Sequence, residues 1–349
     1  MPVKNLGEEK LVRKLGEIRI EALLRFVAQK LLRLGLLLIA VAVFTFVLLS
    51  FSPIDPVRAY IGADMMRISA DQQALIAERW GLDQPIWGRF WDWLGQLLQG
   101  NLGTSLVFNR PVSEVIAIRF QASLQMLAIA WLLSGFLGLA LGVLAGALAG
   151  SLVDRLIRLY AYTLASTPTF WLALLLLIVF AVNWKVAPIC CAAPPGVRSQ
   201  DVTFWQHIHH LLLPATALSI IGIANITLHT RQKLIEVLRS DYVLFALAQG
   251  ESLWNVVRYH GLRNILLPAI TLQFASLSEL FGGSVLVEQV FAYPGLGEAT
   301  VTAALRSDIP LLVGIVFFSA LFVYTGNTLA DLAYPIIDPR IRLGGQAVG

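Results

Sequence analysis

The chain has 349 residues, of which 57% are hydrophobic and only 14% are charged. Soluble domains carry about 25% charged residues, so this composition excludes an ordinary soluble protein and predicts an all-α, polytopic membrane protein. The formal net charge of +4 does not indicate a nucleic-acid partner, because basic residues in membrane proteins gather in the cytoplasmic connections.

Six apolar runs are long enough to cross a bilayer, which takes about 20 residues. The first, 34–54, follows a charged N-terminal extension, 1–33, and is expected to be retained rather than cleaved as a leader. A large segment, 55–119, separates it from a core, 120–334, and the chain ends in a tail, 335–349. The five predicted spans of the core are 120–153, 159–184, 211–228, 265–287 and 311–330.

Lysine and arginine set the predicted orientation. They are frequent in the N-terminal extension, in the connection after residue 153 and in the connection 230–264. The connection between the fifth and sixth spans instead carries three acids, Glu288, Glu298 and Asp308, against Arg306. Both termini and residues 230–264 are therefore predicted to be cytoplasmic, with 55–119 outside.

The connection 230–264 is longer than a turn requires and is rich in helix formers. The spacing of apolar residues predicts one helix over 230–249 and a second over 252–263. Gly250 is the expected stop of the first helix, Ser252 the expected cap of the second, and Pro268 is expected in the first turn of span five. Such a helix pair either lies on lipid headgroups or docks into a groove on a partner.

Glu279 is an acid inside the predicted fifth span, where a charge is costly. We expect it to face a translocation pathway or a partner helix, or to hydrogen-bond to Ser276, Ser278 or a neighbouring span. A carboxylate beside a pathway would favour a cationic cargo.

The stretch "FAYPGLG", 291–297, predicts a reversing turn, because Pro294, Gly295 and Gly297 suit sharp changes of chain direction. It either lines the mouth of the pathway or forms a packed turn. Tryptophans in the 55–119 segment favour an interfacial aromatic belt, with a docking surface as the alternative; they are Trp80, Trp87, Trp91 and Trp93.

Three histidines, His207, His209 and His210, share a predicted external connection with Cys190 and Cys191. Imidazole and thiolate suit nickel, copper or zinc, but the spacing matches no zinc pattern, so they are weak candidates and we predict no metal site. The adjacent cysteines predict no disulfide framework.

No Gly-x-x-x-x-Gly-Lys-Ser/Thr phosphate loop and no His-Glu-x-x-His motif occurs in the sequence. The chain is therefore expected to bind no ATP, to hold no cofactor and not to be an enzyme.

Five segments, in order, resemble the ABC-importer permeases of the dipeptide, oligopeptide and nickel transport family. Together they cover roughly residues 30–342. They are "RWGLDQPIWGRFWDWLG" within 79–112, "LASTPTFWLALLL" at 164–176, "DYVLFALAQG" with "LRNILLP" at 241–268, "VEQVFAYPGLGE" within 285–312, and "NTLADLAYPIIDPRIR" at 327–342.

The resemblance implies a bacterial inner-membrane subunit that forms half of a translocation channel for peptides or for nickel and other metal chelates. A second permease, two ATPase subunits that use ATP, and an external binding protein would complete the importer. It also implies ATPase-coupling residues in the connection 230–264. The residues that we predict for this contact are Asp241, Tyr242, Ala246, Gly250, Arg263 and Asn264.

The chain departs from the family pattern before Gly250, where basic residues are usual and "LFALAQ" stands instead; apolar packing is expected to replace charge there. The small residues of 137–150 are expected to serve contact within the permease pair. The rival interpretation is a stand-alone transporter or channel for a small cationic solute, which would usually show internal repeats that are not evident here.

Overall fold

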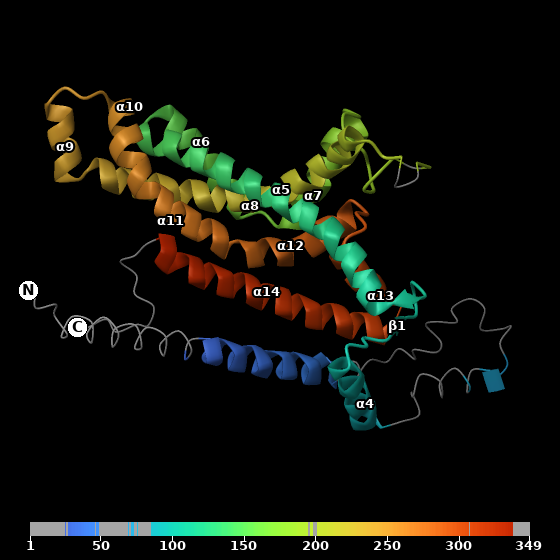
Figure 1. Cartoon of the computed structure of the whole chain (residues 1–349). Coiled ribbons are helices and arrows are strands. Elements are labelled where there is room, and N and C mark those ends of the chain that lie inside the picture. The colour runs from blue at the N-terminus through green and yellow to red at the C-terminus, as the bar shows by residue number, and fades with distance from the viewer. Residues whose placement is uncertain are drawn as a thin grey trace, which may run out of the picture.

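The computed structural model describes residues 25, 27–45, 47–48, 69, 71–72, 75, 85–194, 196–197, 201–306 and 308–337. Its long helices run side by side between two ends (Figure 1). One end carries the short helices α9 (Asp241–Ala248) and α10 (Leu253–Val256) and is called the hairpin end. The other carries α13 (Leu296–Leu305) and the strand pair β1 (Thr104–Ser105) and β2 (Arg110–Pro111), and is called the turn end.

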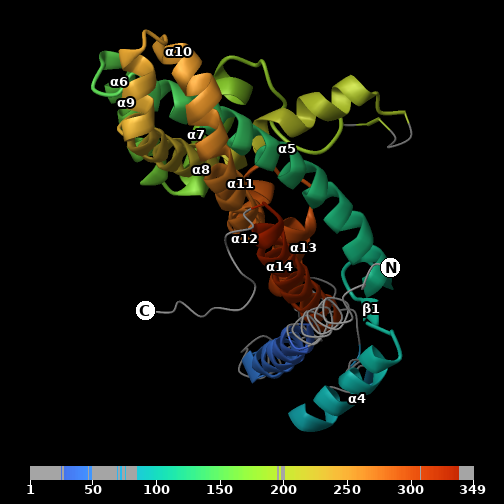
Figure 2. The ribbon, with the colours of Figure 1, turned by 60° about the vertical axis from the view of Figure 1, so that its left-hand side comes forward.

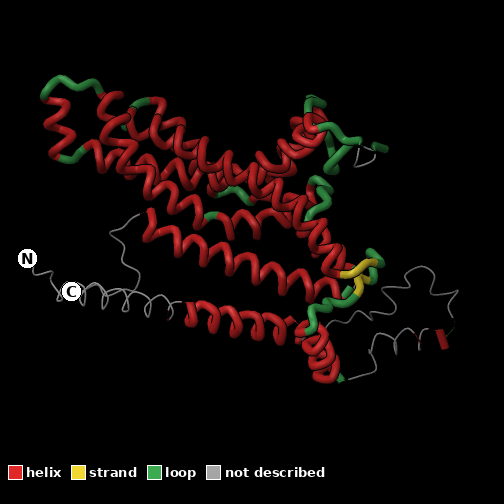
Figure 3. Tube along the Cα trace, in the orientation of Figure 1, coloured by secondary structure: helices red, strands yellow, loops and turns green. Residues whose placement is uncertain are grey.

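The remaining elements are almost all helical, as Figure 3 shows. A helix at Val27–Thr45 precedes α4 (Ile86–Leu98). The core comprises α5 (Val112–Ala147), α6 (Leu152–Ala165), α7 (Thr169–Leu176) with the π-helical segment η2 (Leu177–Asn183), α8 (Phe204–Leu238), the π-helical segment η3 (Val257–Gly261), α11 (Leu262–Ala275), α12 (Leu277–Val290) and α14 (Ile309–Ile337).

Four helices in the described part of the chain are long and apolar enough to cross a membrane: Val27–Thr45, Val112–Ala147, Phe204–Leu238 and Ile309–Asp331. Two further pairs pass the same test only together. Leu152–Ala165 meets Thr169–Asn183 at a bend of 109°, and Leu253–Ala275 meets Leu277–Val290 at 47°. The six expected spans are reached only when each bent pair counts as one.

The helices extend beyond the apolar runs that indicated them. The first helix begins at Val27, inside the predicted N-terminal extension, and α5 begins at Val112 rather than at 120. Helix α8 contains Pro214 well inside its length, and Pro268 likewise lies inside α11 instead of in a first turn. Residues 1–24 and 338–349 lie outside the described residues, as do Trp80 and most of 46–84.

Helices α5 and α8 pack in very close contact through glycines of α5. A Cβ atom on Gly142 would lie 2.6 Å from the Thr230 Cβ, and one on Gly138 would lie 2.7 Å from the Ile226 Cβ. Small residues let membrane helices approach closely. The expectation that this stripe serves contact between two permeases is wrong for these glycines, because they pack inside the chain.

At the turn end, Asp308 joins the strand pair to α14. Its buried carboxylate accepts hydrogen bonds from the Ser105 hydroxyl at 2.6 Å and the Val107 N–H at 2.9 Å. It also accepts from the Leu311 N–H at 3.1 Å and so caps α14. Helix α4 packs Phe90 and Trp93 against Val313 of α14 and exposes Trp87 and Trp91.

The two cysteines form a bond that the sequence did not indicate. Cys190 and Cys191 are joined as a vicinal disulfide, which is a single local bond and no framework across the fold. Cys191 has φ 75°, and its N–H donates to the Phe291 carbonyl at 3.0 Å. The pair thus ties the loop before α8 to the turn before α13.

The glycine contact predicts a stability difference between two conservative changes. Gly142→Ala places a methyl group against Thr230 and should cost about 1–3 kcal/mol through overpacking. Gly282→Ala is the matched control, since a Cβ there meets nothing within 4 Å. Thermal unfolding of the purified protein should show a lower midpoint for Gly142→Ala alone, and equal midpoints would contradict the close packing.

Candidate functional site

The hairpin end is built from the end of α8, then α9, α10 and the start of α11. The predicted helix 230–249 is in fact two, because α8 ends at Leu238 and α9 begins at Asp241. Between them, the Ser240 hydroxyl donates to the Val237 carbonyl at 2.6 Å, and such a local bond competes with helix continuation. Figure 2 shows α9 and α10 together at one end of the bundle.

The predicted stop and cap of the hairpin are confirmed. Gly250 follows α9 with φ +91°, which side chains rarely adopt. Ser252 then caps α10 by accepting the Asn255 N–H at 3.4 Å. These two residues reverse the chain between α9 and α10.

One face of the hairpin is buried within the chain and the other is exposed. Val243 and Ala246 of α9 pack with Leu234, Val256 and Ile265 in a hydrophobic cluster. Ala246 is therefore buried and is not exposed for contact with a partner. The exposed side chains include five large apolar or aromatic ones, Tyr242, Leu244, Phe245, Trp254 and Tyr259, beside polar ones such as Asp241 and Arg258.

The polar residues predicted for partner contact divide into two groups. Asn264 donates from its side chain to the Tyr242 hydroxyl at 3.2 Å and to the His260 carbonyl at 2.7 Å, so it braces the hairpin internally. Asp241 lies exposed in the first turn of α9, where a negative charge favours the helix dipole. Arg263 is exposed and makes no hydrogen bond or ion pair among the described residues.

A buried ion pair anchors α8 just before the hairpin. Asp154, whose side chain is fully buried, accepts from Arg231 through Nε at 2.5 Å and through Nη2 at 2.8 Å. It also accepts the Gly150 N–H at 2.8 Å, while Arg158 lies 3.4 Å away. This bidentate pair fixes the start of α6 against α8.

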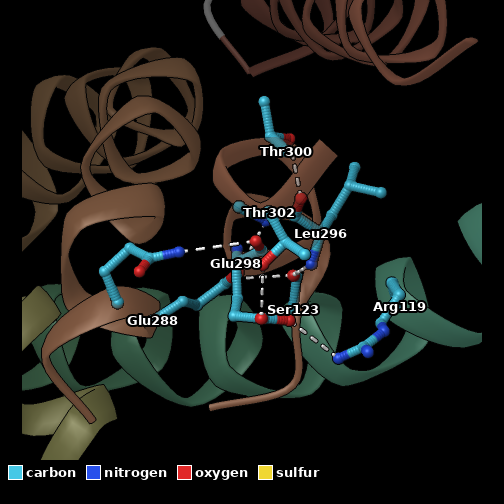
Figure 4. Close-up of polar contacts among 9 residues, drawn as sticks. Arg119, Ser123, Glu288, Leu296, Glu298, Thr300 and Thr302 are labelled. Atoms are coloured by element: carbon cyan, nitrogen blue, oxygen red, sulfur yellow. Dashed lines mark hydrogen bonds and ion pairs between the residues drawn. The ribbon is translucent and has the colours of Figure 1, made fainter. Parts of the chain in front are cut away.

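At the turn end, Glu288 of α12 holds the start of α13 (Figure 4). Its fully buried carboxylate accepts from the Ser123 hydroxyl of α5 at 2.6 Å and from the Gly297 and Glu298 N–H groups at 2.7 and 3.1 Å. Ser123 in turn accepts the Leu296 N–H at 2.7 Å. These five residues are called the Glu288 clamp.

The glycines of "FAYPGLG" are required by this clamp. A Cβ on Gly295 would overlap the Glu288 carboxyl group, and one on Gly297 would lie 2.5 Å from the Val285 Cα. Both glycines are buried and Pro294 is partly buried, so the packed-turn alternative describes this segment. Tyr293, in the same turn, is buried, and burial raises the pKa of its hydroxyl.

A second link joins the turn to α5 beside the clamp. Arg119 of α5 forms an ion pair with Glu298 at 3.0 Å, and Thr302 donates to the same carboxylate at 2.9 Å. Figure 4 places Arg119 and Ser123 on α5 below the start of α13. The clamp and this ion pair thus fasten α5, α12 and α13 together.

Glu279 is exposed and has no hydrogen bond among the described residues. The two serines expected as its partners are engaged elsewhere: Ser276 donates to the Gln273 carbonyl at 2.9 Å and Ser278 to Asn327 at 2.7 Å. The alternative of an internal hydrogen bond to either serine is therefore wrong. The carboxylate faces outward from the described part of the chain.

The histidines contact three different partners. His207 contacts the Gln125 side chain at 2.8 Å, His209 the Val186 carbonyl at 3.0 Å and His210 the Cys190 carbonyl at 3.1 Å. In the described residues, no group of three or more histidine, cysteine and acidic side chains is arranged to hold a metal ion.

Comparison with known sequences identifies the protein family. The family model described as "binding-protein-dependent transport system inner membrane component" matches residues 138–343. The family model for the N-terminal part of such components matches residues 23–126. The chain belongs to this family of transport permeases. A permease of this family is a transport component and not an enzyme, and its helices make it a multi-pass protein of the inner membrane.

Several relatives of this permease are similar over nearly the whole chain. The oligopeptide transport system permease protein AppB of Bacillus subtilis is 34% identical over 88% of this chain and 95% of its own length. The glutathione transport system permease protein GsiC of Salmonella typhimurium is 35% identical, with coverage of 92% and 99%. The probable D,D-dipeptide transport system permease protein DdpB of Escherichia coli is 33% identical, with coverage of 89% and 96%.

The sequence patterns did not indicate the two buried acids of this permease. In the sequence, Glu288 is one of three acids in the connection between the fifth and sixth predicted spans, and it stands six residues before Pro294. Asp154 stands in a connection otherwise rich in arginine, and such an isolated acid is the signal for an ion pair. Their partners Ser123 and Arg231 are distant in sequence and carry no signal of their own.

The Asp154–Arg231 pair predicts an asymmetric effect of mutation. Asp154→Ala leaves Arg231 without its carboxylate and should cost about 3–5 kcal/mol, whereas Asp154→Ala with Arg231→Met should recover part of that loss. Glu236→Ala removes an exposed ion pair with Lys233 and serves as a control with little effect. Equal loss for the single and double variants in denaturation experiments would contradict the pairing.

Proposed function

We propose that this chain is one permease subunit of an ATP-driven importer, with its hairpin end in the cytoplasm and its turn end outside. Both termini are then cytoplasmic, each bent helix pair forms one span, and residues 55–119 form a large external segment. The hairpin and the start of α13 lie at opposite ends of the bundle (Figure 1), and the basic residues of 230–264 favour the cytoplasm for the hairpin end.

The exposed aromatic face of α9 and α10 is the observation that carries the proposal. An apolar helix face that its own chain does not cover is suited to a groove on another protein, and the chain has no phosphate loop of its own. We assign the groove to an ATPase subunit, of which the importer holds two. Tyr242 and Asp241 would contact it directly, with Arg263 nearby, while Asn264, Gly250 and Ala246 shape the hairpin.

A second permease and an external binding protein complete the proposed assembly. The substrate class is a short peptide, because the relatives are named for oligopeptides, dipeptides and glutathione. Nickel or another metal chelate is the less supported cargo. The decisive experiment is purification from membranes with a tag on this chain: an ATPase should copurify, whereas a stand-alone transporter would copurify with none.

Gly250 provides a test of the hairpin that separates backbone shape from side-chain bulk. A Cβ at this position meets nothing within 4 Å, but the backbone has φ +91°. Gly250→Val should therefore strain the turn by about 1–2 kcal/mol and lower uptake per ATP hydrolysed. Gly250→Asn, which tolerates this conformation, should stay close to wild type. Equal uptake by both variants would count against the coupling role.

A substitution at Glu279 tests whether this residue lies beside the translocation pathway. With its exposed carboxylate inside a span, Glu279 is proposed to face the channel formed with the second permease. Glu279→Gln keeps the shape and removes the charge, so uptake of a lysine-containing dipeptide should fall several-fold relative to dialanine. Glu251→Gln, at an exposed acid of the hairpin, is the control. An unchanged ratio of the two uptake rates would remove Glu279 from the pathway.

A further inference from the structure

The Glu288 clamp joins three helices at one end of the bundle. Its carboxylate is fully buried and accepts three hydrogen bonds, one from α5 and two from the start of α13. A buried polar group is strongly stabilised when its hydrogen bonds are all satisfied, and the Arg119–Glu298 ion pair adds a second connection. Helices α12, α13 and the adjoining part of α5 therefore form a rigid unit, called the outer unit.

Helix α12 is one half of a bent helix pair, and the other half, which contains α11, is joined to the hairpin. Ile265, near the start of α11, is buried in the cluster that also contains Val243 of α9 and Val256 of α10. Close-packed interiors transmit displacement rather than absorb it. A movement of the hairpin is therefore passed to α11.

The two halves meet at Ser276, where the helix bends by 47°. The Gln273 carbonyl accepts from the Ser276 hydroxyl at 2.9 Å and from the Trp131 indole N–H of α5 at 2.8 Å. The Gln273 amide in turn donates to the Trp131 carbonyl. Side chains thus donate hydrogen bonds to backbone carbonyls at the break, as they do at other kinks in membrane helices.

We propose that Glu288 is a positioning residue of the transport cycle. By fixing α12 to α13 and α5, it makes the outer unit rigid, so that movement of the hairpin and α11 is taken up at Ser276 and turns the outer unit as a whole. This inference rests on the proposed coupling function. Without the clamp, α12 would bend or slide alone and the movement would not reach the turn before α13.

The chemistry of the clamp specifies a carboxylate. Both oxygens of Glu288 must accept hydrogen bonds, because the Ser123 hydroxyl and two backbone N–H groups point at them. A glutamine side chain has the same size but presents an N–H₂ group to one of these sets of donors. Glu288→Gln therefore breaks one side of the clamp without changing its volume.

The test measures distances and turnover in the intact complex with its ATPase. Spin labels on Leu266 of α11 and Leu305 of α13 span the joint, and labels on Leu124 of α5 and Leu305 lie within the outer unit; all three positions are exposed. The native cysteines of this chain are already joined to each other, so without reductant the introduced cysteines are the reactive thiols of this chain. On trapping with ATP and vanadate, the Leu266–Leu305 distance should shift while the Leu124–Leu305 distance stays constant.

Glu288→Gln should reduce the shift across the joint and broaden the Leu124–Leu305 distribution. Uptake per ATP hydrolysed should fall about tenfold, the loss expected from one charge-assisted hydrogen bond, while ATPase copurification and basal hydrolysis persist. Glu288→Asp, which keeps a carboxylate, should recover part of the uptake. Glu114→Gln, at an exposed glutamate of α5, is the matched control and should match wild type.

Two results would overturn the proposal. One is a wild-type Leu124–Leu305 distance that changes as much as the Leu266–Leu305 distance, and the other is unchanged uptake per ATP in Glu288→Gln. Should Glu288→Gln fail to fold, Ser123→Ala removes the same hydroxyl bridge and must show the same split between uptake and hydrolysis. Failure of the coupling function itself is distinguishable, since then no ATPase copurifies and neither distance responds to nucleotide.

Discussion

Backbone N–H groups at the start of a buried helix must find an acceptor where water does not reach, and this permease meets that constraint with carboxylates. Glu288 accepts the second and third N–H groups of α13, Asp308 accepts an N–H group of α14, and Asp154 accepts the Gly150 N–H before α6. Each carboxylate is fully buried. An unsatisfied polar group inside a membrane protein costs several kcal/mol, so these acids stabilise the backbone at or next to three helix starts.

The same three acids also connect elements that are distant in sequence. Asp308 holds the strand pair through Ser105, Glu288 holds α5 through Ser123, and Asp154 holds α8 through Arg231. Capping and tertiary contact are thus combined in single side chains. The chain is therefore held in a defined position at each of these helix starts. The position of the hairpin end relative to the turn end depends on these contacts.

Local signals in the sequence predicted local structure well. Gly250 and Ser252 marked the reversal in the hairpin because a left-handed turn and a helix cap depend on the residues at those positions alone. Span limits were less accurate, because the start of α5 carries Glu114 and Arg119, which pair with Arg110 and Glu298 instead of facing lipid. An apolar run cannot reveal a charge that is neutralised by a partner in another helix.

In the candidate site, too, local structure could be predicted from the sequence, whereas contacts between distant residues could not. The pattern around Pro294 predicted a tight turn correctly, but the reason for Gly295 and Gly297 is the carboxyl group of Glu288 packed against them. Likewise, Ala246 was predicted as a contact for a partner, yet it is buried against the chain itself. Periodicity identifies a face of a helix, whereas only the folded chain shows which neighbour covers it.

The glycine-lined contact between α5 and α8 also bears on how the protein is made. Gly138 of α5 packs on Ile226 of α8, and the intervening chain contains α6 and α7. Because α5 precedes α8 in the chain, its glycine stripe lacks this partner until α8 has been synthesised. The close α5–α8 contact can therefore form only after α8 has joined α5 in the bilayer.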